Sequence, residues 1–319
     1  MQSAIQRIGG RGTAALPLYR ARPVSHGPPA LSIGLAVRNG RHVVGRCIES
    51  ILAQDFGDLE LVVCDNVSDD GTVDLLEDYA RSDSRVAISV NDVNIGSHEN
   101  MKRTLERSRG TYFRWISADD WLEQSCLSEC VRTLEERKDA IGATTYFTIH
   151  SDGSSRYEEY QGEFPTSPDP ARRFERMLWF FHAGDAKYDP IYGVYRRDVL
   201  LRSRRLRPSE QTDWLLCAEL ALTGPILNVD RRLAHRTRSY PTRPDRAGFR
   251  RRLDPARARQ LESSARRLYR DLGALVDDAD LSEAQRRRCR AALRRFWIRD
   301  VVARGRNRIA TARHRVLTR

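Results

Sequence analysis

The stretch GTYFRWISADDWLEQ, residues 110–124, places two adjacent aspartates directly after an apolar and aromatic run. The run has the composition of a buried strand, and Asp119 and Asp120 follow its end. Two carboxylates this close repel one another unless a cation, a proton or a hydrogen-bonding ligand offsets their charge. The end of this strand is therefore the first candidate for a functional site.

Upstream of this strand, the sequence alternates between the two periodicities of secondary structure. Apolar runs predict strands over 31–37, 59–64 and 85–90, and helical spacing predicts helices over 41–54, 73–82 and 97–110. Such alternation is typical of an α/β domain with a largely parallel sheet, in which ligands bind at the carboxyl ends of the strands. Polar pairs follow three of the predicted strands, namely Arg38-Asn39, Asp65-Asn66 and Asp119-Asp120. Three polar strand ends at one edge indicate a site.

Composition narrows the class of protein. The 319 residues are 40% hydrophobic, yet no stretch approaches the roughly 18 consecutive apolar residues of a spanning helix. Residues 1–29 lack the apolar core of a signal peptide, so we expect a disordered lead-in and a cytoplasmic protein. Six cysteines lie scattered in apolar segments without zinc-site spacing, which predicts buried free thiols in a reducing compartment.

From about Leu31 to Arg238 the chain resembles the family 2 glycosyltransferases, which are nucleotide-sugar-dependent enzymes of the GT-A fold. The resemblance is carried by SIGLAVRNG (32–40), CIESILAQDFGDLELVVCDNVSDDGT (47–72) and NIGSHENMKRTLERSRGTYFRWISADD (94–120), and more weakly by YGVYRRDVL (192–200) and TDWLLCAELALTG (212–224). It implies a GT-A type, Rossmann-like, mostly parallel central sheet flanked by helices over 30–245. Residues 30–120 would form the nucleotide-binding half and residues 121–245 the acceptor-binding half, followed by a basic helical extension over 246–319.

The resemblance also implies a donor site for a UDP-, dTDP- or GDP-sugar. The residues that would hold the nucleotide sugar are Ala36, Val37, Arg38, Asp65, Asn66, Gly96, Ala118 and Asp119. A carboxylate or amide can hydrogen-bond the edge of a pyrimidine. Arg38 would either stack on the base or remain a solvated loop arginine.

The aspartate pair corresponds to the DxD-type motif of that family. Asp119 would face the ribose, and Asp120 would bind Mg²⁺ or Mn²⁺, which prefer carboxylate and phosphate oxygens. The alternative is that one aspartate caps a helix beginning near Trp121. His235 is a second candidate metal ligand or an ordinary strand histidine, and Arg236 or Arg238 could serve the diphosphate instead.

Asp213 is the candidate general base, because inverting members of the family use an acid just before a helix to deprotonate the acceptor hydroxyl. Its alternative role is an N-terminal helix residue stabilised by the helix dipole. Glu210 and Glu219 are poorer candidates. Residues 202–210 contain no glycine and Thr212 stands where a first acid is common, so a degenerate, donor-binding member is an open alternative.

The positive charge gathers at the end of the chain. From Arg250 onward there are 21 arginines and 8 acids, a balance of +13, so the remaining residues sum to about −1 of the net +12. A neutral body argues against one evenly basic nucleic-acid-binding surface, and a nucleic-acid-binding protein that acts through its arginine-rich tail stays an open alternative. The C-terminal helices would either lie on an anionic membrane surface, suiting a peripheral enzyme with a glycolipid acceptor, or pack on the catalytic domain. A saccharide or small natural product is equally open as the acceptor.

Overall fold

The computed structural model describes residues 27–151, 153–157, 160, 162–182, 190–203, 211–237, 246–256, 258 and 265–317, and for residues 301–317 only the helical backbone. Most of the predicted lead-in, together with Glu210 and Arg238, lies outside the described residues.

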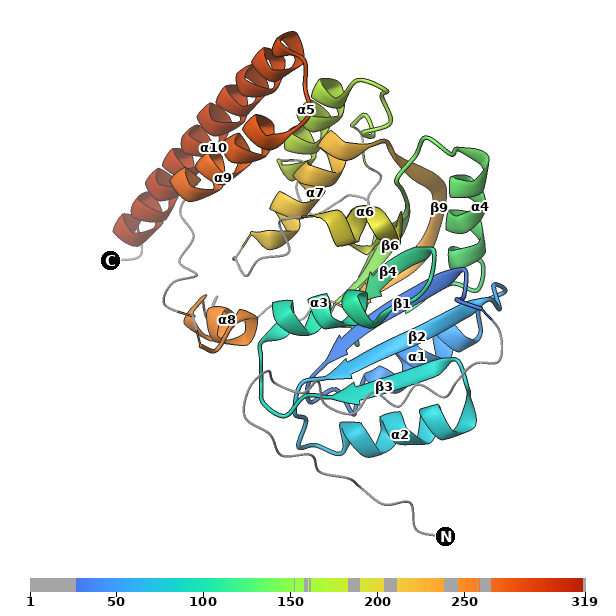
Figure 1. The fold of residues 1–319 in the computed structure, drawn as a ribbon. Helices are drawn as coiled ribbons and strands as arrows, with labels where there is room; N and C mark the ends of the chain where they lie inside the picture. The colour runs from blue at the N-terminus through green and yellow to red at the C-terminus, as the bar shows by residue number, and fades with distance from the viewer. Residues whose placement is uncertain are drawn as a thin grey trace, which may run out of the picture.

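The first half of the chain forms the parallel part of a single sheet. Strands β1 (Leu31–Val37), β2 (Leu59–Asp65), β3 (Val86–Val90) and β4 (Tyr112–Ile116) lie in the order β3-β2-β1-β4, all parallel. Helices α1 (Val44–Leu52), α2 (Thr72–Ser82) and α3 (Ser97–Arg107) make the crossovers (Figure 1). Val37 pairs with Asp65 and Leu35 with Ile116, so three strands end together at one edge. This arrangement confirms the predicted α/β architecture.

The second half continues the same sheet with mixed strand directions. Strand β8 (Val194–Arg196) runs antiparallel to β4, followed in order by β6 (Gly142–Ser151), β9 (Ile226–Thr237) and the short β5 (Trp121–Leu122). Strands β6 and β9 are parallel, and β7 (Ser154–Arg156) folds back on β6 as an antiparallel hairpin. The other helical elements here are α4 (Cys126–Glu136), α5 (Pro170–Phe181), the 3₁₀ turn η1 (Pro190–Tyr192), α6 (Arg197–Arg202) and α7 (Thr212–Thr223).

Side-chain alternation along the strands builds one apolar core on each face of the sheet. On β1, Leu31, Ile33 and Leu35 are fully buried against the face covered by α1, α2 and α4. On β4, Phe113 and Trp115 point to the opposite core, which is covered by α3, α5 and α7. All six cysteines are buried free thiols, as predicted.

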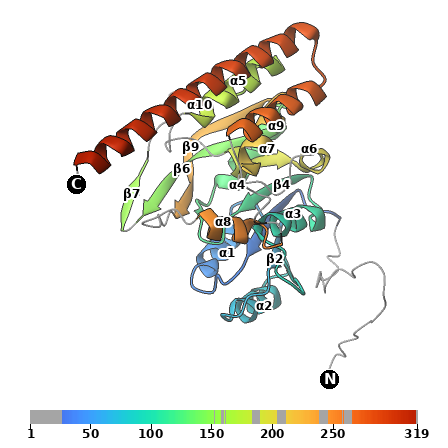
Figure 2. The ribbon, with the colours of Figure 1, turned by 90° about the vertical axis from the view of Figure 1, so that its left-hand side faces the viewer.

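The C-terminal region folds as α8 (Arg246–Leu253), α9 (Ala265–Asp278) and the long α10 (Glu283–Leu317). Helix α10 lies alongside α5 and α9, which both views show (Figures 1 and 2). Its apolar stripe of Cys289, Leu293 and Phe296 is buried in the core that α5 and α7 share. The apolar stripe of residues 283–300 therefore packs on the domain.

Several arginines of the same stretch of α10 contact groups on neighbouring elements. Arg288 pairs with Asp169 at 2.5 Å, Arg290 with Asp277 at 2.8 Å and Arg295 with Glu175 at 2.6 Å. Arg286 donates to the carbonyl oxygens at the end of α9, including that of Asp277 at 2.7 Å. These guanidinium groups therefore face acids and carbonyl oxygens of the same chain. Among the helices that the structure describes, none is long and apolar enough to cross a bilayer.

Candidate active site

The ends of β1 and β2 bring the first predicted donor residues together. The Asn66 amide donates to the Val37 carbonyl oxygen at 2.9 Å, and the Asn91 amide donates to the Asp65 carbonyl oxygen at 2.9 Å. Asp65 is fully buried, and its carboxylate accepts from the backbone amide of Ser68 at 2.9 Å and from the Ser68 hydroxyl. A buried carboxylate held this way shapes the loop that follows β2.

That loop is fastened to the loop after β1. The Asn39 amide donates to the Ser68 hydroxyl at 2.8 Å, and the Gly40 amide donates to the Thr72 hydroxyl at 2.9 Å. Asn39 and Val67 hold left-handed backbone conformations, with φ of 52° and 63°. Such conformations are costly for residues other than glycine and gather at functional sites. Arg38 is exposed beside this pair of loops, and Ala36 is partly buried below it.

The Asn66 side chain extends the same edge toward Gly96. Its amide group donates to the Asn94 side-chain oxygen at 2.8 Å, and its own oxygen accepts from the Ile95 amide at 3.0 Å. The Asn94 oxygen also accepts from the Gly96 amide at 3.0 Å. These hydrogen bonds bring Gly96 next to Asn66, although nothing in the local sequence signals the contact.

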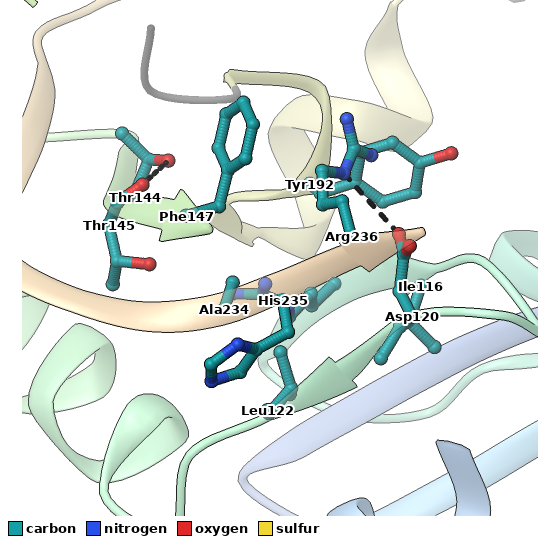
Figure 3. Close-up of a pocket in the computed structure, with 11 residues that line it drawn as sticks. Ile116, Asp120, Leu122, Thr144, Thr145, Phe147, Tyr192, Ala234, His235 and Arg236 are labelled. Carbon is teal, nitrogen blue, oxygen red and sulfur yellow. Dashed lines mark hydrogen bonds and ion pairs between the residues drawn. The ribbon is translucent and has the colours of Figure 1, made fainter. Parts of the chain in front are cut away.

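The aspartate pair lies at the same edge, after β4. A Cβ built on Gly40 would lie 3.8 Å from the Ala118 methyl group, so the segment 117–120 adjoins the loop after β1. The Ser117 hydroxyl donates to Asp119 Oδ1 at 2.5 Å. Asp120 is buried, its Oδ1 accepts from the Thr237 amide at 3.1 Å, and its Oδ2 accepts from Arg236 Nε at 3.3 Å (Figure 3).

The expectation that a helix begins near Trp121 is wrong. Trp121 and Leu122 form β5, which pairs with His235 and Ala234 of β9, and α4 begins only at Cys126. Neither aspartate is therefore at a helix N-terminus. Pairing with a strand more than a hundred residues later prevents the helix, and no local pattern reveals it.

His235 lies on the side of β9 opposite to Arg236 (Figure 3). Its ring stacks on Trp121 with centroids 4.9 Å apart, Nδ1 meets His150 Nε2 at 3.0 Å, and Nε2 meets Glu123 at 2.6 Å. Burial, then the neighbouring His235 and Arg46, lower the pKa of His150. Metal ligation by His235 stays a prediction, one that requires the ring to give up a hydrogen bond.

Asp213 is exposed in the first turn of α7. The next residue, Trp214, stacks on Phe181 of α5 with ring centroids 4.6 Å apart, which fixes the start of the helix. Helix α7 packs against η1, whose Tyr192 ring lies 4.1 Å from the Arg236 guanidinium. Glu219, two turns further along α7, accepts from Ser203 at 2.6 Å and lines a separate groove.

The residues around Asp120 do not fit a divalent cation in this arrangement. Both carboxylate oxygens accept hydrogen bonds, and one of the donors is a guanidinium. Within the described residues, no group of three histidines, cysteines or acids is placed to hold a metal ion. Asp120 as a ligand of Mg²⁺ or Mn²⁺ remains a prediction from the sequence.

The sequence model of "Glycosyl transferase family 2" matches residues 32–201, more than half of the chain. The chain belongs to this family. The match includes every predicted donor residue of the nucleotide-binding half, from Ala36 to Asp120, and ends before Asp213 and His235. The fold agrees with the expected GT-A type.

Other family 2 proteins show how far the similarity reaches. The chain is 28% identical over 126 residues to the putative teichuronic acid biosynthesis glycosyltransferase TuaG of Bacillus subtilis, covering 40% of this chain and 50% of that protein. It is 36% identical over 121 residues to chondroitin synthase of Escherichia coli, covering 38% and 17%. These matches span half or less of the relatives' length. The crystal structure of S. aureus TarS 1–349 in complex with UDP superposes with a TM-score of 0.59 at 16% identity, covering 80% of this chain and 68% of that one.

Proposed function

We propose that this family 2 glycosyltransferase moves a sugar from a nucleoside-diphosphate sugar to an acceptor hydroxyl with inversion at the anomeric carbon. One observation carries the proposal: the predicted donor residues meet at one edge of the sheet. They are Val37, Asp65, Asn66, Gly96 and Ala118–Asp120. That edge is where open parallel sheets bind ligands. The crystal structures of S. aureus TarS 1–349, a protein of similar fold, in complex with UDP and with UDP-GlcNAc support a nucleotide-sugar donor.

The proposed reaction is a direct displacement. The acceptor oxygen attacks the anomeric carbon, its proton passes to the Asp213 carboxylate, and the bond between that carbon and the diphosphate oxygen breaks. The sugar is thereby joined to the acceptor, and the nucleoside diphosphate leaves with the electron pair. Exposure at the start of α7 leaves the Asp213 carboxylate accessible to an acceptor, as general-base work requires.

Donor turnover tests the proposal. The purified protein is offered UDP-, dTDP- and GDP-sugars with saccharide, glycolipid and natural-product acceptors, and the released nucleoside diphosphate and the glycosylated product are quantified. We expect one donor to be consumed, with release and product in equal amounts. If a nucleotide binds but no donor is consumed with any acceptor, the second candidate holds, a donor-binding protein without transferase activity. The unusual approach to Asp213, with Thr212 in place of an acid, favours that candidate.

A further inference from the structure

Asp120 already has a cationic partner, and it belongs to the chain itself. Arg236 Nε lies 3.3 Å from Asp120 Oδ2, with side-chain exposures of 17% and 8%. The neighbouring Thr237 fixes the other carboxylate oxygen through its backbone amide. Because both donors come from the end of β9, this strand holds the carboxylate in one orientation. A charge pair with so little solvent contact is screened weakly.

Aromatic rings hold the Arg236 guanidinium in place. It lies 4.1 Å from the centre of the Tyr192 ring and 5.4 Å from that of Phe147. Figure 3 shows these two rings on the same side of β9 as Arg236. Stacking on aromatic faces is a property of guanidinium groups and reduces the rotamer freedom lost when an anion binds.

A second guanidinium lies nearby. Arg114 comes from β4, is 3% exposed, and lines the same small cavity as Asp120, His235 and Arg236. The charged side chains among the lining residues are thus two guanidiniums and one carboxylate. A divalent cation entering here would meet two like charges, whereas an anion would be attracted.

We infer that Arg236 supplies the positive charge that binds the donor diphosphate, so that nucleotide binding does not require a divalent cation. The inference rests on the proposed function and assigns a diphosphate-binding residue to the same site. A fixed guanidinium can hydrogen-bond two phosphate oxygens at once and stabilise the charge that develops on the leaving diphosphate. Asp120 then acts as a positioning residue that orients Arg236.

Nucleotide affinity measured with and without metal tests this inference. Dissociation constants for UDP, dTDP and GDP are measured by calorimetry in EDTA and in excess MnCl₂. For the natural chain, we expect one nucleotide to bind equally well in both buffers, within about threefold. Arg236→Gln should weaken its binding in EDTA about tenfold or more, since a hydrogen bond to a charged group contributes about 1.5–3 kcal/mol. Arg236→Lys should retain part of the affinity.

The matched control is Arg232→Gln, on the same strand, where the guanidinium stacks on Tyr157 at 3.7 Å instead. It should bind nucleotide like the natural chain, and thermal melts of all variants should show the same folded state. If EDTA abolishes nucleotide binding to the natural chain and Mn²⁺ restores it, the inference about Arg236 is overturned while the proposed function stands. If no nucleotide binds in either buffer, both are overturned.

Discussion

The backbone of Leu253 lies directly against Gly96, although about half of the chain separates the two residues. A Cβ added at Gly96 would lie 2.2 Å from the Leu253 carbonyl oxygen, and Gly96 has a φ of +83°. The end of α8 thus covers the turn before α3, and Asn94, which binds that turn, is hydrogen-bonded to Asn66. Through this contact, the C-terminal region is physically connected to the predicted donor site.

Gly96→Ala is expected to displace α8. With φ +83° and ψ 162°, Gly96 lies in a backbone region that is essentially restricted to glycine and costs an alanine about 1–3 kcal/mol. The clash with the Leu253 backbone adds to this cost, so the free energy of unfolding should fall by about 2–4 kcal/mol. Limited trypsin digestion should cleave faster at Arg250–Arg252. Gly153→Ala is the matched control, because its φ is +76° and nothing lies within 4 Å of the added methyl group. Equal losses of stability in the two variants would show that the Leu253 contact is unimportant.

His98, close to the same contact, should make stability depend on pH. Burial lowers the pKa of His98 to about 4, an effect that Asp254 partly opposes. Between pH 6.5 and 4 the unfolded chain binds a proton at this residue that the folded chain does not. Stability should therefore be complete above pH 6.5 and fall as the pH decreases, by about 2 kcal/mol between pH 7 and pH 5 from His98 alone.

Urea unfolding at several pH values measures this slope. His98→Gln should flatten it between pH 7 and pH 5, whereas His42→Gln, at an exposed position, should leave it as in the natural chain. A slope that persists unchanged in His98→Gln would assign the proton uptake to another group, such as His150, whose pKa is also lowered.

What the sequence could predict was local. Apolar runs located β1, β2, β3 and β4, and the polar residues at their ends located the site edge, because a strand end and its loop are adjacent in the chain. The partners of Asp120 come instead from β9, and Trp121 forms a strand only because His235 lies opposite it. The contact between Gly96 and Leu253 is of the same kind. Such contacts depend on how distant segments pack, which no local pattern records.

The arginine-rich stretch of α10 is a second case in which the sequence does not show what the side chains contact. The run RRRCR at 286–290 suggests a basic surface, yet Arg286 binds carbonyl oxygens at the end of α9, and Arg288 and Arg290 pair with Asp169 and Asp277. The number of charges can be read from the sequence. Only the fold shows that these charges face acids and helix ends of the same chain.

Asp65→Asn should weaken nucleotide binding about tenfold or more while leaving the fold intact. The amide nitrogen of asparagine cannot accept the Ser68 hydroxyl hydrogen bond, so Ser68 would lose the position in which it accepts from Asn39. Calorimetry with the nucleotide that the natural chain binds measures the loss. Asp69→Asn, at an exposed position in the same loop, is the control. Unchanged affinity in Asp65→Asn would exclude this carboxylate from the donor site.

Asp213→Asn separates the two roles of this residue. As a general base, its loss should reduce sugar transfer by about 10²–10⁴-fold with donor affinity unchanged, because only proton transfer in the transition state is affected. As a helix-dipole partner, its loss should cost only about 0.3–1 kcal/mol of stability and leave transfer intact. Asp198→Asn is the matched control, since Asp198 occupies the first turn of α6, is exposed and forms an ion pair with Arg202 at 2.9 Å. Both variants should show similar, small shifts in thermal unfolding, and only Asp213→Asn should lose transfer. Normal turnover in Asp213→Asn would place the base elsewhere.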